Sequence, residues 1–189
     1  LQRDVLLVAQ PPETGTVQVV RNAVDADIYG AETEVNFVVD SALQLNANLG
    51  YTDSRFYNVQ FDLSGDNVID AADRRLKPPR LSRWTYNVGA TYVRDIGKVE
   101  ARANVDFGYR SRAASNDANT TFLSPRNLLN ASLAFTWPDN AFELAVYGKN
   151  LLNEALEGSQ VLISRGVPPY TLRSIEKGRI LGVSGKFRF

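Results

Sequence analysis

The 189-residue chain has 21 basic and 21 acidic residues, so it carries no bulk charge that would attract nucleic acid, and no such partner is expected. It contains no cysteine, methionine or histidine, which excludes disulfides, thiolate and imidazole metal ligands, and the commonest general base of enzymes. No run of 18 apolar residues occurs, so a membrane-spanning helix is not expected.

Alternation of apolar and polar residues predicts eight strands along the chain. All but the first run 11 to 13 residues, whereas a usual strand has about 5–6 and a tilted strand crosses the hydrocarbon layer in about 9–11. The first strand is partial and opens near Leu1, so we expect the chain to be a piece of a longer protein. In chain order the predicted strands cover residues 4–10, 27–39, 42–53, 83–94, 98–110, 127–137, 141–152 and 178–189.

The connections between these strands alternate between short and long. Tight turns are predicted at Val39–Ala42, Arg94–Lys98 and Trp137–Ala141, and long loops at 11–26, 54–82, 111–126 and 153–177. Transmembrane barrels of the bacterial outer membrane have short periplasmic turns and long extracellular loops. We therefore expect the long loops to be extracellular and the C-terminus to be periplasmic.

Each predicted strand has one uncharged face and one polar face, because successive side chains of a strand point to opposite sides. The apolar face includes Leu43, Leu45, Val88, Val105 and Leu133. The charged residues of the opposite face are predicted to line an aqueous interior, where they solvate the wall or mark a ligand path. They are Glu32, Glu34, Lys98, Glu100, Arg102, Asp106, Arg110 and Lys149.

Aromatic residues of the apolar face gather at both strand ends, with Tyr51 and Trp84 near the long loops and Trp137 and Phe142 near the tight turns. Two such girdles around an aliphatic band are typical of a transmembrane barrel. The predicted fold class is therefore all-β, an antiparallel transmembrane β-barrel segment of about eight strands. A large soluble β-sandwich is the alternative, but its aromatic residues would lie in the middle of the core.

Three internal stretches resemble, in the right order, strands of TonB-dependent outer-membrane receptors. Two of them, RNAVDADIYGAETEVNF at 21–37 and LQLNANLGYTDSRF at 43–56, resemble consecutive strands of that family. The third, AVYGKNLLNEA at 145–155, resembles the penultimate strand of the barrel. Together with the C-terminal stretch, these matches cover nearly the whole chain.

The C-terminal stretch GVSGKFRF resembles the signal that delivers barrels to the outer-membrane assembly machinery. Its alternating aromatic residues Phe187 and Phe189 match that pattern. Its middle departs from it, because Gly182 stands at the place of a polar residue and Ser184 at the place of a glycine.

The resemblance implies a 22-stranded barrel with a plug in its lumen, and residues 1–189 would form the last third of that single barrel domain. It also implies import of a scarce nutrient, such as a siderophore, a cofactor or an oligosaccharide, driven by the TonB complex. The plug and the TonB box that contacts TonB are absent from these residues. The implied partners are outer-membrane lipid, the remaining barrel strands and plug, the TonB complex, the barrel assembly machinery and an unidentified small molecule.

Two other functions are open at this point. Eight strands are enough to close a small barrel and fill its interior, so the chain is alternatively a complete eight-stranded barrel that acts as an adhesin or a structural anchor. An outer-membrane hydrolase would need a nucleophile paired with a histidine, and the sequence has no histidine. Enzymatic activity is therefore not expected.

The long loop at 54–82 contains a segment with the spacing of a twelve-position calcium loop. Positions 1, 3, 5, 7, 9 and 12 are Asp62, Ser64, Asp66, Val68, Asp70 and Asp73. Asn67 replaces the usual glycine at position 6, and the aspartate at position 12 is shorter than the usual glutamate, a variation that resembles dockerin loops. The spacing predicts a calcium ion in this loop.

Aromatic residues of the predicted loops are a second group of candidate ligand contacts. Loops at the end of a rigid scaffold are common binding places, and aromatic rings offer large apolar contact surfaces. The residues expected to be exposed there are Phe56, Tyr57, Phe61 and Tyr170, with Pro168 and Pro169.

Overall fold

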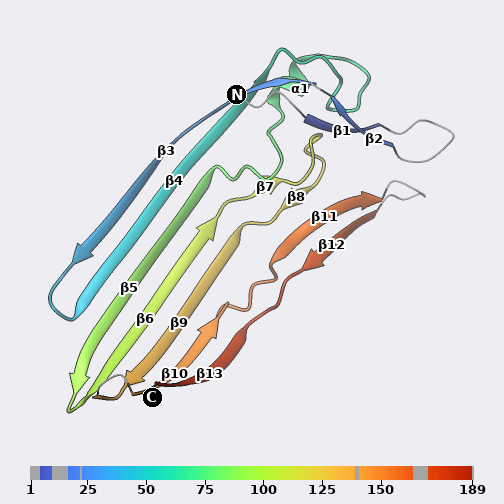
Figure 1. Ribbon diagram of the computed structural model, residues 1–189. Helices are drawn as coiled ribbons and strands as arrows, with labels where there is room; N and C mark the ends of the chain where they lie inside the picture. Colours follow the sequence, from blue (N-terminus) through green and yellow to red (C-terminus); the bar gives the residue numbers. More distant parts are fainter. Residues whose placement is uncertain (1–4, 10–16, 22, 139–140, 164–169, 189) are drawn as a thin grey trace. The chain divides into compact units, whose positions relative to one another are not determined.

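The computed structural model describes residues 5–9, 17–21, 23–138, 141–163 and 170–188 (Figure 1). The chain divides into two compact units. The loop unit comprises residues 1–31, 52–83 and 112–123, and the strand unit comprises residues 32–51, 84–111 and 124–189. Within the described residues, no helix has the length and apolar character needed to span a membrane.

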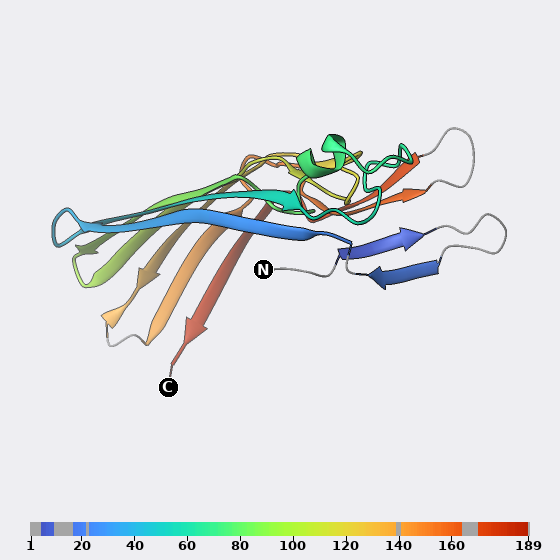
Figure 2. The same cartoon turned by 90° about the horizontal axis from the view of Figure 1, so that it is seen from above.

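Long antiparallel strands form one seven-stranded sheet in the order β13–β10–β9–β6–β5–β4–β3 (Figures 1 and 2). The bounds are β3 Asp25–Val38, β4 Leu43–Tyr57, β5 Trp84–Ile96, β6 Val99–Arg110, β9 Arg126–Thr136, β10 Phe142–Lys149 and β13 Ile180–Phe187. The all-β prediction is confirmed, and these bounds agree closely with the predicted strands.

Shorter elements occupy the connections. They are the hairpins β1 Val5–Ala9 with β2 Val17–Arg21, β7 Ala113–Ala114 with β8 Phe122–Leu123, and β11 Glu157–Ile163 with β12 Tyr170–Ile175, and the helix α1 Ala71–Arg75. The first predicted strand, 4–10, forms β1 but pairs with β2 and not with the large sheet. That sheet therefore contains seven of the eight predicted strands.

Strand register confirms the two predicted faces, because residues directly opposite each other on neighbouring strands share a face. One row of the apolar face crosses six strands without a charged residue. Its members, from β4 to β13, are Leu43, Tyr92, Ala103, Leu133, Val146 and Val183. We call this side of the sheet the apolar face and the other side the polar face.

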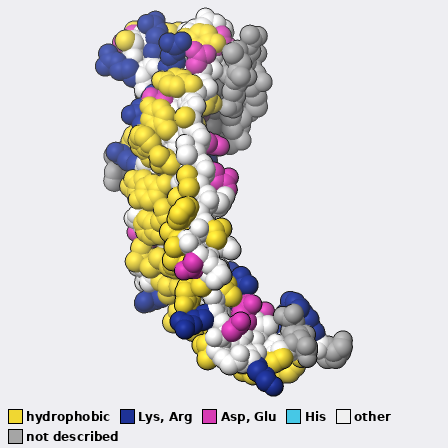
Figure 3. All heavy atoms as spheres, turned by 90° about the vertical axis from the view of Figure 1, so that its left-hand side faces the viewer, with side chains coloured by type: hydrophobic (Ala, Val, Ile, Leu, Met, Phe, Trp, Pro, Cys, Tyr) yellow, Lys and Arg dark blue, Asp and Glu magenta, His cyan; other side chains and the backbone are white. Residues whose placement is uncertain are grey.

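Within the described residues, no second layer covers the apolar face. Leu45, Val88, Val105 and Leu133 are 40%, 46%, 43% and 37% exposed, although all lie in mid-strand. Figure 3 shows hydrophobic side chains gathered in a continuous band along the long strands. In a soluble β-sandwich these side chains would be packed against another sheet, so the sandwich alternative is wrong. An apolar surface of this extent is typical of contact with lipid or another partner.

Aromatic contacts lie at both ends of the strands, as the sequence predicted. At the end with the long connections, here the loop end, the ring centroids of Tyr51 and Trp84 are 4.7 Å apart and those of Tyr86 and Tyr109 are 4.8 Å apart. At the opposite end, here the turn end, Phe142 lies 4.5 Å from Phe187 and 5.0 Å from Trp137 by the same measure. These clusters bound the aliphatic band.

Tight turns close the turn end of the sheet. Between β3 and β4, a side-chain oxygen of Asp40 accepts hydrogen bonds from the backbone N–H groups of Ala42 and Leu43, at 2.7 and 2.8 Å. Between β5 and β6, Gly97 has φ +66°, a left-handed conformation that glycine adopts without strain. These short connections hold consecutive strands in an antiparallel register.

The sheet is open within the described strands. Its edges are β3 and β13, and these two strands are not paired with each other. A complete eight-stranded barrel would close by pairing its edge strands. The arrangement therefore does not favour the small-barrel alternative and is consistent with a segment of a larger barrel.

Candidate functional site

The charged residues predicted to line an interior lie on the strands of the polar face, with one exception. Glu100 and Arg102 of β6 form an ion pair at 3.1 Å, and both side chains remain about half exposed. Glu34 of β3 accepts a hydrogen bond from the Asn36 amide at 3.0 Å. Lys98 lies in the turn between β5 and β6, outside the strands.

A network of neutral and charged polar groups crosses the middle of the polar face. The amide of Asn130 on β9 donates to Asp106 on β6 at 2.8 Å, and its oxygen accepts from the backbone N–H of Asn150 at 2.9 Å. The hydroxyl of Thr91 on β5 donates to Asn104 at 2.9 Å. Beside this network lies a pocket of about 500 Å³ lined by Asn104, Asp106, Asn130 and Lys149 among others. Such a pocket offers hydrogen bonds to a polar molecule.

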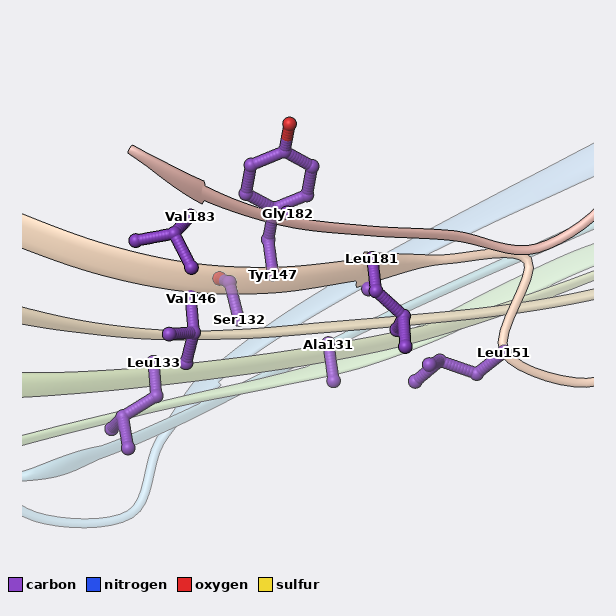
Figure 4. Close-up of a pocket in the computed structure, with 10 residues that line it drawn as sticks. Ala131, Ser132, Leu133, Val146, Tyr147, Leu151, Leu181, Gly182 and Val183 are labelled. Atoms are coloured by element: carbon purple, nitrogen blue, oxygen red, sulfur yellow. The ribbon is translucent and has the colours of Figure 1, made fainter. Parts of the chain in front are cut away.

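Lys149 and its neighbours form a second feature of the polar face. Its ammonium lies 5.9 Å from the ring centroid of Tyr147. Tyr147 is directly opposite Gly182 and points away from the face that carries Leu133, Val146 and Val183 (Figure 4). The aromatic ring therefore covers a glycine that offers no side chain of its own.

Arg110 lies at the loop end of the polar face, directly opposite Arg126 on β9. Arg126 was not among the predicted site residues, because the alternating pattern placed the start of that strand at residue 127, one position later. Its place could have been found only from the register between β6 and β9, which brings together residues that are 16 positions apart in the sequence.

The loop unit has its own apolar core. Ala23, Val24, Ala26, Phe56 and Leu63 are buried there, and Val59, Phe61 and Leu76 pack against them. Phe56 was expected to be exposed for ligand contact, but it is only 5% exposed, because the loop folds over it. The side chains of Tyr170, Pro168 and Pro169 lie outside the described residues.

Hydrogen bonds join the segments of the loop unit. Lys77 donates from its ammonium to Asp53 at 2.8 Å and to the backbone carbonyl of Ser54. The side chain of Asn119 accepts from the backbone N–H of Lys77 and donates to its carbonyl, both at 2.9 Å. Arg83 also pairs with Asp53, at 3.1 Å. The long loop between β4 and β5 therefore has a defined fold that these hydrogen bonds hold together.

The predicted calcium segment is folded around its first and last aspartates. Asp62 accepts from the backbone N–H groups of Gly65 and Asn67 at 2.7 and 2.6 Å, and the hydrogen bond from Gly65 contributes most to lowering the pKa of Asp62. Asp70 begins helix α1 as its N-cap, and Asp73 completes the capping box.

Within the described residues, no three acidic side chains come together as ligands of one metal ion. Calcium binding stays a prediction from the sequence. Calorimetry on the intact protein, with Asp62→Ala and Asp66→Ala variants as controls, tests it, and the absence of calcium-dependent heat would end the hypothesis.

The structure describes one of the two aromatic residues of the predicted assembly signal, and it lies in the C-terminal strand β13. Phe187 is 70% exposed on the apolar face and its ring contacts Phe142. Phe189 lies outside the described residues. Recognition by the assembly machinery stays a prediction.

Comparison with known proteins matches this arrangement. A family model described as TonB dependent receptor-like, beta-barrel, matches residues 2–151. The ferric yersiniabactin uptake receptor FyuA from Yersinia pestis has a similar structure, with a TM-score of 0.74 and 17% identity over 90% of this chain and 25% of that chain. For BauA, the ferric preacinetobactin receptor from Acinetobacter baumannii, the TM-score is 0.63 with 12% identity, over 96% of this chain and 25% of that chain.

Comparison with curated proteins gives no match. The chain spans about a quarter of the length of FyuA and of BauA.

Proposed function

The chain belongs to the TonB-dependent receptor β-barrel family, and from this premise we propose that it forms part of the wall of an outer-membrane transporter that imports a small nutrient. Barrels of this family sit in the bacterial outer membrane. In the proposed arrangement the apolar face contacts lipid and the polar face lines the lumen. The long connections face the outside of the cell and the C-terminus faces the periplasm.

The observation that supports this proposal most directly is the asymmetry of the seven-stranded sheet. Its apolar face carries exposed aliphatic side chains between two aromatic clusters, and its other face carries amides, hydroxyls and charges. Lipid suits the apolar face, because aliphatic side chains need no hydrogen bonds and acyl chains offer none. Water in a lumen satisfies the second face.

A ferric siderophore is the first ligand class that we propose to test. FyuA and BauA are named as receptors for ferric yersiniabactin and ferric preacinetobactin, which supports this choice through likeness of fold. A cofactor and an oligosaccharide are the classes to test beside it. The plug, the TonB complex and the barrel assembly machinery are the proposed partners of the complete receptor.

Uptake by cells that contain the complete receptor tests the function. We expect deletion of the receptor gene to abolish TonB-dependent uptake of one labelled ligand from a panel of ferric siderophores, cofactors and oligosaccharides. Reintroduction of the complete receptor restores this uptake in cells with TonB and not in cells without it. Uptake of every ligand that is unchanged by the deletion would show that the transport proposal is wrong.

A further inference from the structure

Two arginines stand side by side at the loop end of the polar face. Arg110 is the last residue of β6, Arg126 is the first residue of β9, and the two are directly opposite each other. Directly opposed side chains start from Cβ atoms about 4.5–5.5 Å apart, and two like charges in such a pair repel each other. Each side chain ends in a positively charged guanidinium.

Neither arginine is compensated by the part of the protein that the structure describes. The Nε atom of each is buried and has no hydrogen-bond partner within the described residues. The nearest acidic residue on the polar face of β6 is Asp106, two rows away, and its carboxylate already accepts from Asn130. The pair therefore combines unmatched charge with unsatisfied N–H donors, and both are unfavourable unless an anion completes them.

A pocket of about 320 Å³ adjoins the two arginines. Its polar lining includes Asn48, Thr85 and Asn87, which supply neutral hydrogen-bonding groups and no negative charge. Gly108 is two residues before Arg110 on the same face of β6, directly opposite Asn87 on one side and Leu128 on the other. Because glycine has no side chain, this position leaves space beside the guanidiniums. The pocket is large enough for one oxyanion group and the atoms attached to it.

We propose that Arg110 and Arg126 form an oxyanion site that receives a carboxylate or phosphate group of the transported ligand. The planar fork of a guanidinium donates two parallel hydrogen bonds to such groups, which a lysine ammonium does not match. An anion between the two arginines satisfies their free donors and removes their mutual repulsion. This inference rests on the proposed function, because it requires the polar face to line the lumen.

Anion binding to the purified complete receptor in detergent tests the site. Inorganic phosphate and citrate serve as probes in calorimetry at low ionic strength, where charge interactions are least screened. We expect both anions to bind the parent receptor, and Arg110→Gln and Arg126→Gln each to weaken this binding about tenfold or more, the loss expected for one charge-assisted contact. The matched control is Arg102→Gln, on the same strand and face but paired with Glu100, and it leaves the affinity unchanged.

Thermal melting in a buffer without phosphate or carboxylates gives a second readout. There we expect the two glutamine variants to be at least as stable as the parent receptor, because each removes one of two repelling charges. If instead the parent receptor binds neither anion and the variants melt earlier than it does, an acidic side chain of the protein itself already occupies the pair, and the proposal is wrong. Retained uptake without anion binding would overturn this inference alone, whereas anion binding without TonB-dependent uptake would count against the transport function alone.

Discussion

Asp73 shows how one carboxylate organises the long loop between β4 and β5. Its side chain is completely buried and accepts hydrogen bonds from the backbone N–H groups of Leu63, Ser64 and Asp70 at 2.8, 2.8 and 2.9 Å. Burial alone raises the pKa of Asp73, but these hydrogen bonds outweigh burial, so its pKa lies below the usual value of about 3.9. A depressed pKa in the folded state means that the ionised form stabilises the loop.

We predict that Asp73→Ala destabilises the folded loop by about 3 kcal/mol, because three backbone N–H groups lose their acceptor in a buried place. Amide hydrogen exchange of residues 62–76 in the intact protein measures this effect. The contribution of Asp73 is fully present above about pH 4 and is lost as the pH falls toward its folded-state pKa. The control is Asp66→Ala, which removes an exposed carboxylate with a single backbone hydrogen bond and leaves exchange nearly unchanged. Equal protection in both variants would contradict the prediction.

Sequence spacing alone found Asp73 but did not determine its role. The twelve-residue pattern identifies a carboxylate at a fixed position, yet the same residue is also the third residue of helix α1, whose N-cap is Asp70. Whether the side chain contacts an ion or backbone amides depends on how the loop folds over Leu63 and Phe56, which local spacing does not encode. Arg126 was not identified as a site residue, because the predicted strand began at residue 127. A strand boundary that is wrong by one residue leaves the first side chain of β9 out of the polar face.

At the scale of elements, the long strands could be predicted because a two-residue period over 11 or more residues allows only one pair of faces. The hairpin β11–β12 and strand β2 could not be predicted in the same way. They are 5 to 7 residues long and lie within connections, where a short alternating run does not stand out from irregular loop.

The pairing of β10 with β13 leads to a prediction about glycine. A Cβ atom at residue 182 would lie 2.5 Å from the Cζ and Oη atoms of Tyr147, whereas a Cβ atom at residue 185 would lie 3.8 Å from Phe142. We therefore expect Gly182→Ala to destabilise the receptor by about 1–3 kcal/mol through overpacking, and Gly185→Ala to be neutral. Thermal melting of the complete receptor in detergent measures both.

The double variant Gly182→Ala with Tyr147→Ala identifies the cause of that effect. Removal of the ring leaves space for the new methyl group, so the double variant is more stable than expected from the sum of the single changes. Additive losses would show that the glycine acts through its backbone and not through contact with Tyr147.

At the scale of the whole molecule, contact of the apolar face with lipid is a prediction that two neighbouring residues test. Val105 and Asn104 lie in the middle of β6 and point to opposite faces, because successive residues of a strand alternate. Val105 is 43% exposed on the apolar face, and Asn104 lines the polar pocket of about 500 Å³. We expect Val105→Arg to lower the free energy of unfolding in lipid vesicles by about 2–4 kcal/mol, because the guanidinium would enter the acyl region.

Asn104→Arg places the same guanidinium one residue away, beside an aqueous pocket. It gives up a hydrogen bond from Thr91 and a long, weak one to Ser132 at 3.4 Å, so we expect a loss of only about 1 kcal/mol. Urea unfolding of the complete receptor in vesicles measures both variants under the same conditions. An arginine at residue 105 should cost much more than one at residue 104 only if the apolar face contacts the acyl chains of lipid, where a charge is unfavourable. Similar losses of stability for the two variants would therefore mean that protein, and not lipid, covers the apolar face in the complete receptor.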